Sequence, residues 1–172
     1  MKHVLTILLM LLLLLSSGCG TDRSSSPDNQ EPNPNAMPED FAFTVSYGIG
    51  SINRIDTYNS TIVKDLIADG TAEATLAFTK DELQSIYERM MEIDVFGEKQ
   101  LIVDNGCLRQ PISDDYWKIR IDGVEKQMHI TTQFCELTED AQAFMDLRNY
   151  IVEIVSGKEE YKALPEPNGA YL

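Results

Sequence analysis

Six carboxylates and one histidine in the second half of the chain are the residues whose types could support hydrolysis or cation binding. The carboxylates are Asp104, Asp114, Asp115, Glu136, Glu139 and Asp140, and the histidine is His129. Hard cations such as Ca²⁺ prefer oxygen ligands, which makes Asp104, Asp114 and Asp115 the metal-site candidates. The spacing around Asp104 matches no EF-hand loop, because Asn-Gly follows it without ligands at alternate positions. A solvated acidic face is therefore the simpler interpretation.

The same residues could serve acid–base catalysis only if the fold gathers them. A hydrolase would need a concave site where at least three of Asp104, Asp114, Asp115, His129, Glu136 and Glu139 converge. The sequence contains no GxSxG elbow, and Gly48-Ile49-Gly50 lacks the continuation of a dinucleotide-binding loop. On a strand, His129 would share a face with Gln127 and Thr131, as a solvated histidine does. We expect no catalytic residue and no cofactor.

The chain has three cysteines, Cys19, Cys107 and Cys135. Outside the cytoplasm, Cys107 and Cys135 form an even pair that predicts a disulfide. Closing that loop would contribute roughly 3 kcal/mol in the chain-entropy model. Two buried thiols remain the alternative. Zinc is disfavoured, because there is no CxxC and neither histidine adjoins either cysteine.

The first cysteine lies just after an apolar segment at the start of the chain. Met1-Lys2-His3 is basic, and the run from Val4 to Leu15 is apolar. As a helix this run would measure roughly 18 Å, too short for a hydrocarbon core of about 30 Å, so it predicts an export signal. The alternative is an ordinary secretory signal with an incidental cysteine.

The residues Ser16-Ser17-Gly18-Cys19 resemble the lipobox of bacterial prolipoproteins. The resemblance implies that residues 1–18 are a signal peptide and that Cys19 becomes the first mature residue and carries the acyl chains, palmitate among them. Two or three acyl chains anchor a protein stably. In layout and in its ending "YKALPEPNGAY", the remaining chain looks like the small cell-envelope lipoproteins of Gram-positive bacteria. The resemblance thus implies a lipid-anchored protein on the extracytoplasmic face of a bacterial cell membrane.

Composition and charge limit the partners. The formal net charge is −14, which opposes nucleic acid binding because that requires cations to displace counterions from phosphate. Residues 19–39 combine the lipidated cysteine with a Ser-, Pro- and Asn-rich stretch, which predicts a flexible tether. We expect residues 40–172 to form a single globular domain. Its partners would be the membrane, through the lipid on Cys19, and an envelope protein or ligand of unknown identity.

Hydrophobic periodicity predicts the elements of this domain. Strands are expected at residues 41–47, on both sides of a turn at residues 58–60, and at 73–79. A Thr79/Glu82 capping box predicts a helix over 80–96 that ends at Gly97. Residues 116–131 predict a hairpin that turns at Asp122-Gly123, and Thr138 is expected to cap a helix that ends at Gly157. The last residues could pack on the sheet or be presented to a partner.

The expected fold class is α+β: an antiparallel sheet of five or six strands in the order β-β-β-α-β-β-α, with two helices packed on it. The leading hypothesis is a membrane-anchored, non-enzymatic binding, accessory or inhibitor module of the cell envelope. The alternative is an envelope hydrolase that uses the acidic cluster, with or without a cation. A binding module predicts a broad apolar or aromatic surface with charges around it, whereas a hydrolase predicts a concave cluster of carboxylates.

Overall fold

A computed structural model describes residues 36–104 and 106–171, and Pro34–Leu172 forms one compact unit. Cys19, the predicted signal peptide and most of the predicted tether lie outside the described residues. The unit contains a six-stranded antiparallel sheet in the order β4-β3-β2-β1-β5-β6. The strands are β1 (Ala42–Tyr47), β2 (Asn53–Asp56), β3 (Thr61–Asp65), β4 (Thr71–Thr75), β5 (Asp114–Ile121) and β6 (Val124–Thr131).

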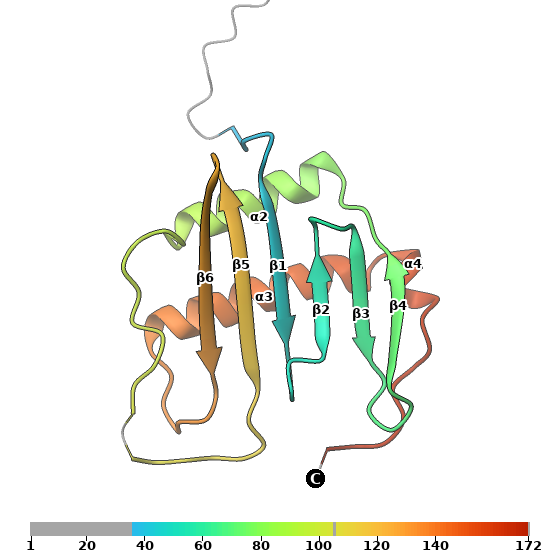
Figure 1. The fold of residues 1–172 in the computed structure, drawn as a ribbon, viewed down its shortest axis with the longest axis vertical. Helices are drawn as coiled ribbons and strands as arrows, with labels where there is room; N and C mark the ends of the chain where they lie inside the picture. Colours follow the sequence, from blue (N-terminus) through green and yellow to red (C-terminus); the bar gives the residue numbers. More distant parts are fainter. Residues whose placement is uncertain (1–35, 105, 172) are drawn as a thin grey trace, which may run out of the picture. The chain divides into compact units, whose positions relative to one another are not determined.

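Among the described residues, the helices cover one face of this sheet and leave the other uncovered (Figure 1). The two long helices are α2 (Lys80–Glu92) and α3 (Glu139–Ser156), and a short turn, α4 (Glu159–Lys162), follows α3. Apolar side chains alternate along the strands, so β1, β2, β3, β5 and β6 bury residues under the helices, whereas β4 at the edge is only partly buried. The largest side chains of this core are almost fully buried: Phe43, Ile55, Ile62, Ile86, Met90, Trp117, Ile119, Phe144 and Ile151. The predicted α+β fold class is confirmed.

The first long helix begins where the sequence predicts and ends earlier. The Thr79 side chain accepts from the Glu82 amide, and the Glu82 carboxylate accepts from the Thr79 amide at 2.7 Å, so the capping box is present. Helix α2 nevertheless stops at Glu92 rather than near Phe96. Asp94 takes a left-handed φ of 48°, and the Val95 amide donates back to the Met90 carbonyl. This is a Schellman-type ending, with Asp94 in the place expected for Gly97.

The second hairpin and the second helix follow the sequence closely. Asp122 and Gly123 both have positive φ, as a two-residue primed turn requires. Trp117, Ile119 and Ile121 point into the core, as do Met128 and Ile130 on the return strand. The Thr138 hydroxyl caps α3 by accepting from the Ala141 amide, and the helix ends at Gly157. The sequence did not predict α4.

The C-terminal segment packs against the β3–β4 hairpin. Asn168 exchanges backbone hydrogen bonds with Leu66 and Ala68, and the Tyr171 hydroxyl donates to the Asp65 carboxylate. Lys64 forms an ion pair with Glu166 at 3.3 Å. The sequence left open whether this segment packs on the sheet or is presented to a partner, and in the structure it packs on the sheet.

Two features of the architecture differ from the sequence-based expectation. The four strands expected individually before α2 are present, whereas the order β-β-β-α-β-β-α counted only three, and the last of them runs over Thr71–Thr75 instead of 73–79. Order also begins before residue 40, since the Met37 amide donates to the Gln84 side chain and Met37 packs on the core. Within the described ranges, no helix is long and apolar enough to cross a membrane.

Candidate functional site

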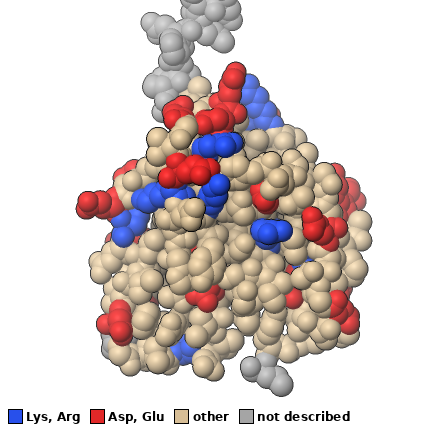
Figure 2. Space-filling model, viewed as in Figure 1, with Lys and Arg blue, Asp and Glu red and all other residues tan. Residues whose placement is uncertain are grey.

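The uncovered face of β5 and β6 carries the polar half of their alternating pattern. Asp114, Tyr116, Lys118 and Arg120 project from β5 on the side opposite Trp117 and Ile119, and Gln127 and His129 project beside them from β6. Figure 2 views this side of the sheet. It shows acidic and basic side chains gathered near the end where β1 begins, with a broad uncharged area below them. The uncharged area is therefore available for contacts that do not rely on charge.

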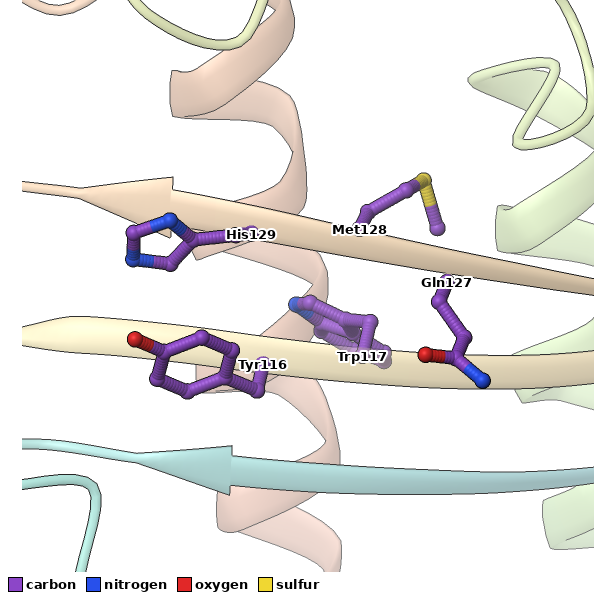
Figure 3. Close-up of a pocket in the computed structure, with 5 residues that line it drawn as sticks. All are labelled: Tyr116, Trp117, Gln127, Met128 and His129. Atoms are coloured by element: carbon purple, nitrogen blue, oxygen red, sulfur yellow. The ribbon is translucent and has the colours of Figure 1, made fainter.

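An aromatic pair lies within this face. Tyr116 is directly opposite His129 in the β5–β6 register, and their ring centroids are 4.4 Å apart with planes that differ by 3°. Tyr116 is 50 % exposed although its strand, β5, is paired on both sides, with β1 and with β6. Figure 3 shows the two rings next to each other over the strands, whereas Trp117 lies behind β5. We call Tyr116 and His129 together the aromatic plate.

A hydrogen bond to Asp114 fixes the histidine ring. His129 Nε2 lies 2.9 Å from Asp114 Oδ1. An ionised carboxylate can accept a hydrogen bond but cannot donate one, so Nε2 is the nitrogen that carries the proton in this bond. The bond holds the ring in one orientation. The backbone carbonyl of Asp114 in turn accepts from the Ser51 hydroxyl. His129 is thus held both by a carboxylate and by the ring of Tyr116, which makes the plate a rigid surface.

Two shallow hollows adjoin Tyr116. One, of about 250 Å³, lies between the plate and Gln127. The other, also of about 250 Å³, lies toward β1 and is lined by Thr44, Ser46 and Lys118 as well as Tyr116 and Gln127. Ser46 and Gln127 make no hydrogen bond with another described residue through their side chains. The hollows therefore offer hydroxyl and amide groups that are free to bind a ligand.

The charged residues beside the plate are already paired with one another. Lys118 Nζ lies 3.0 Å from Glu125 Oε1, and Arg120 donates to the Asp40 carbonyl at 3.1 Å. Both cations also lie over the ring of Tyr58, at 4.8 and 4.9 Å from its centroid. Partial burial, followed by the Glu125 charge, raises the pKa of Tyr58. This end of the face is a local charge network with both signs represented.

The structure separates most of the carboxylates that the sequence grouped together. Asp114 contacts His129 on the uncovered face, whereas Asp115 is buried on the opposite face and accepts from Arg148 at 3.1 Å. The Asp104 carboxylate accepts from the Gly106 amide in the loop before β5.

The remaining candidates lie on or next to α3. Glu136 and Glu139 are exposed, and Glu139 is in the first turn of the helix. The Asp140 carboxylate accepts from the Gln100 amide and pairs with Lys99, and both interactions lower its pKa. A hydrolase would need at least three of the six candidates to converge, whereas among the described residues only the side chains of Asp114 and His129 are in contact. The described part of the chain also contains no group of three or more metal-ligating side chains.

The predicted disulfide between Cys107 and Cys135 is present, with Cα atoms 5.5 Å apart. It joins the loop before β5 to the segment between β6 and α3. Next to it, the Arg109 amide donates to the Gln133 carbonyl and the Arg109 side chain donates to the Thr132 carbonyl. The bridge closes a small antiparallel pairing of two loops rather than a part of the apolar core.

Removing this bridge with the double variant Cys107→Ser/Cys135→Ser is expected to lower the unfolding free energy by about 3 kcal/mol, because the unfolded chain regains the closed loop's entropy. Denaturant unfolding followed by circular dichroism measures it. The native spectrum should be unchanged, since the half-cystines are exposed and lie outside the core. A loss below about 0.5 kcal/mol, the usual size of a surface substitution, would contradict this expectation.

Sequence reasoning did not identify Tyr116 as a site residue and treated His129 as a solvated strand residue. A signal for the pair exists in the hairpin turn. A two-residue turn at Asp122-Gly123 pairs Ile121 with Val124, and continuing outward it pairs Tyr116 with His129. What the turn does not reveal is which face the helices leave uncovered.

Neither a family model, nor a curated protein, nor a solved structure matches this chain.

Proposed function

We propose that the protein is a bacterial cell-envelope lipoprotein, held to the extracytoplasmic face of the membrane by acyl chains on Cys19. Its domain acts as a non-enzymatic binding module, and the aromatic plate is its binding surface. The observation that carries the proposal is the exposure of Tyr116, half accessible within a sheet face and stacked on a histidine that Asp114 holds in place.

Three properties of the face support binding. Its two rings are already held in place by the Asp114 hydrogen bond and by their stacking, so ordering them costs a ligand little. Tyrosine supplies a large contact area with few rotatable bonds, and for this reason it is enriched at binding surfaces. The hollows add free hydroxyl and amide groups, which orient a ligand.

The membrane anchor rests on the sequence. The run of residues 16–19 resembles a lipobox, and a chain with 28 acidic and 14 basic residues would be repelled by anionic head groups. A covalent lipid would overcome that repulsion. Intact mass measured on protein extracted from its native membrane tests the anchor: the expected mass is that of residues 19–172 plus acyl chains. A mass without acyl chains would make the domain a freely secreted protein.

Site-specific photo-cross-linking tests the binding surface. We expect benzoylphenylalanine at position 116, in the full chain on living cells, to form adducts upon irradiation. The matched control is the same label at Met91, which is 49 % exposed on α2, away from the plate. Adducts of any chemical class at position 116, with few at position 91, support the proposal. Equal yields at both positions, or none at position 116, would refute it.

A further inference from the structure

We propose that the ligand of the aromatic plate is a neutral saccharide, with one pyranose ring stacked on Tyr116 and its neighbours in the two hollows. This inference rests on the proposed binding function and specifies its ligand.

The orientation of the plate matches one face of a sugar ring. A pyranose ring has an apolar face of C–H bonds and a belt of hydroxyl groups at its edge. The electron-rich face of an aromatic ring attracts the weakly positive hydrogens of such a C–H face. Tyr116 is half exposed, and His129 stacks on only one face of its ring, so a sugar ring can lie parallel to the other face (Figure 3). An apolar side chain inserted end-on would need a deep pocket, and both hollows are shallow.

The polar groups lie where the hydroxyls of a stacked ring would be. The Gln127 amide offers both a donor and an acceptor and lines both hollows. The Ser46 hydroxyl lies in the hollow toward β1. Neither group has a hydrogen-bond partner among the described residues, so each can bind a ligand without losing an internal contact.

The two hollows also define a direction for the ligand. One is bounded by His129 on β6 and the other by Thr44 and Ser46 on β1, with Tyr116 on β5 between them. A linear oligosaccharide would therefore run across the strands, with its central unit on Tyr116. A single sugar would fill only part of this surface, so affinity should increase with chain length.

The charges of the face favour an uncharged ligand. The Asp114 carboxylate is hydrogen-bonded to His129, and Glu125 neutralises Lys118. With a net charge of −14, the chain as a whole repels polyanions. A nucleobase could also stack on Tyr116, but its phosphates would be repelled. A neutral glycan meets the aromatic face without this penalty.

The test uses the full chain in detergent micelles, titrated calorimetrically with the hexamer of N-acetylglucosamine, with cellohexaose and, as the polyanion, with polyphosphate. We expect at least one neutral hexamer to bind and polyphosphate not to bind. Tyr116→Ala should weaken binding by about tenfold or more. Tyr116→Trp, which keeps a plate of larger area, should retain binding.

The matched control is Tyr171→Ala, which removes a tyrosine of similar exposure that contacts Asp65 away from the plate. It should leave sugar affinity unchanged. Absence of binding by both neutral hexamers, or equal losses in Tyr116→Ala and Tyr171→Ala, would overturn the saccharide assignment. If cross-links then form at position 116 to a protein, the binding surface stands and only its ligand is wrong. If neither sugars nor cross-links are found, both proposals fail.

Discussion

Replacing Arg148 with methionine is expected to lower the unfolding free energy at pH 7 by about 3–5 kcal/mol, because it leaves the Asp115 carboxylate buried without its cation. The Asp115 side chain is only 3 % exposed, and besides Arg148 the Gly48 amide donates a hydrogen bond to it. Arg148 is itself largely buried and lies 5.6 Å from the centroid of the Tyr47 ring. The loss can be measured by urea unfolding followed by tryptophan fluorescence, since the chain has one tryptophan.

The pH dependence of this loss identifies its cause. Burial raises the pKa of Asp115 above its ordinary value of 3.8, although Arg148 opposes the shift. A group whose pKa is higher in the folded state favours folding below the unfolded value and loses that contribution as pH rises through the folded value. Without Arg148 the upward shift becomes larger. The stability difference between Arg148→Met and the native chain should therefore be small near pH 4 and increase toward neutral pH.

A compensating variant serves as the control for the Arg148 substitution. Asp115→Leu combined with Arg148→Met replaces the ion pair with apolar groups and should recover most of the lost stability, since no charge remains buried. A loss that does not depend on pH, or a double variant no more stable than Arg148→Met, would contradict an uncompensated charge as the cause. The loss would then reflect the packing of Arg148 against Tyr47.

Substituting alanine for Trp117 should cost about 3–5 kcal/mol, whereas the same change at the adjacent Tyr116 should cost much less. Trp117 is 2 % exposed, and its ring meets Phe144 edge-on with centroids 5.9 Å apart. Alanine would leave a cavity between the sheet and α3. Tyr116 points to the other face, where water replaces the lost contact. Chemical denaturation followed by far-UV circular dichroism compares the two variants. Tryptophan fluorescence cannot be used, because Trp117→Ala removes the one tryptophan of the chain.

A third variant separates packing from hydrogen bonding at position 117. The Trp117 indole N–H is buried and has no hydrogen-bond partner in the described part of the molecule. Phenylalanine keeps most of the ring contact with Phe144 and removes the unpaired donor. Trp117→Phe should therefore cost less than about 1.5 kcal/mol. Comparable losses in Tyr116→Ala and Trp117→Ala would show that the two residues do not differ in burial as the structure indicates.

The local parts of the fold could be predicted because neighbouring residues determine them. The Thr79/Glu82 capping box and the Asp122-Gly123 turn are short-range patterns, and both occur in the structure. The end of α2 could not be predicted from the position of Gly97. The left-handed residue that ends the helix is usually a glycine, but here it is Asp94. Aspartate tolerates this conformation, and burial of Val95 at 1 % exposure favours the earlier turn.

The candidate site was harder to predict because it depends on long-range arrangement. The alternation of β5 shows that Tyr116 and Trp117 face opposite ways, and the greater polarity of one side predicts which of them is buried. Whether the polar side stays uncovered depends on where both helices pack and on β1 lying beside β5. The neighbouring carboxylates Asp114 and Asp115 point to opposite faces of the sheet for the same reason as Tyr116 and Trp117, because successive side chains of a strand alternate. Proximity in sequence therefore said little about proximity in the site.

The central place of β1 has a consequence for how the chain can fold. Phe43 in β1 lies opposite Ile119 in β5, which follows α2 in the chain, so the middle of the sheet cannot form until the second half is present. Pairings between distant segments close slowly, because the entropy of a long loop must be lost first. Strands β1 to β4 can pair as consecutive neighbours, but β1 keeps one unpaired edge until β5 is present. The central part of the core can therefore assemble only after β5 has been synthesised.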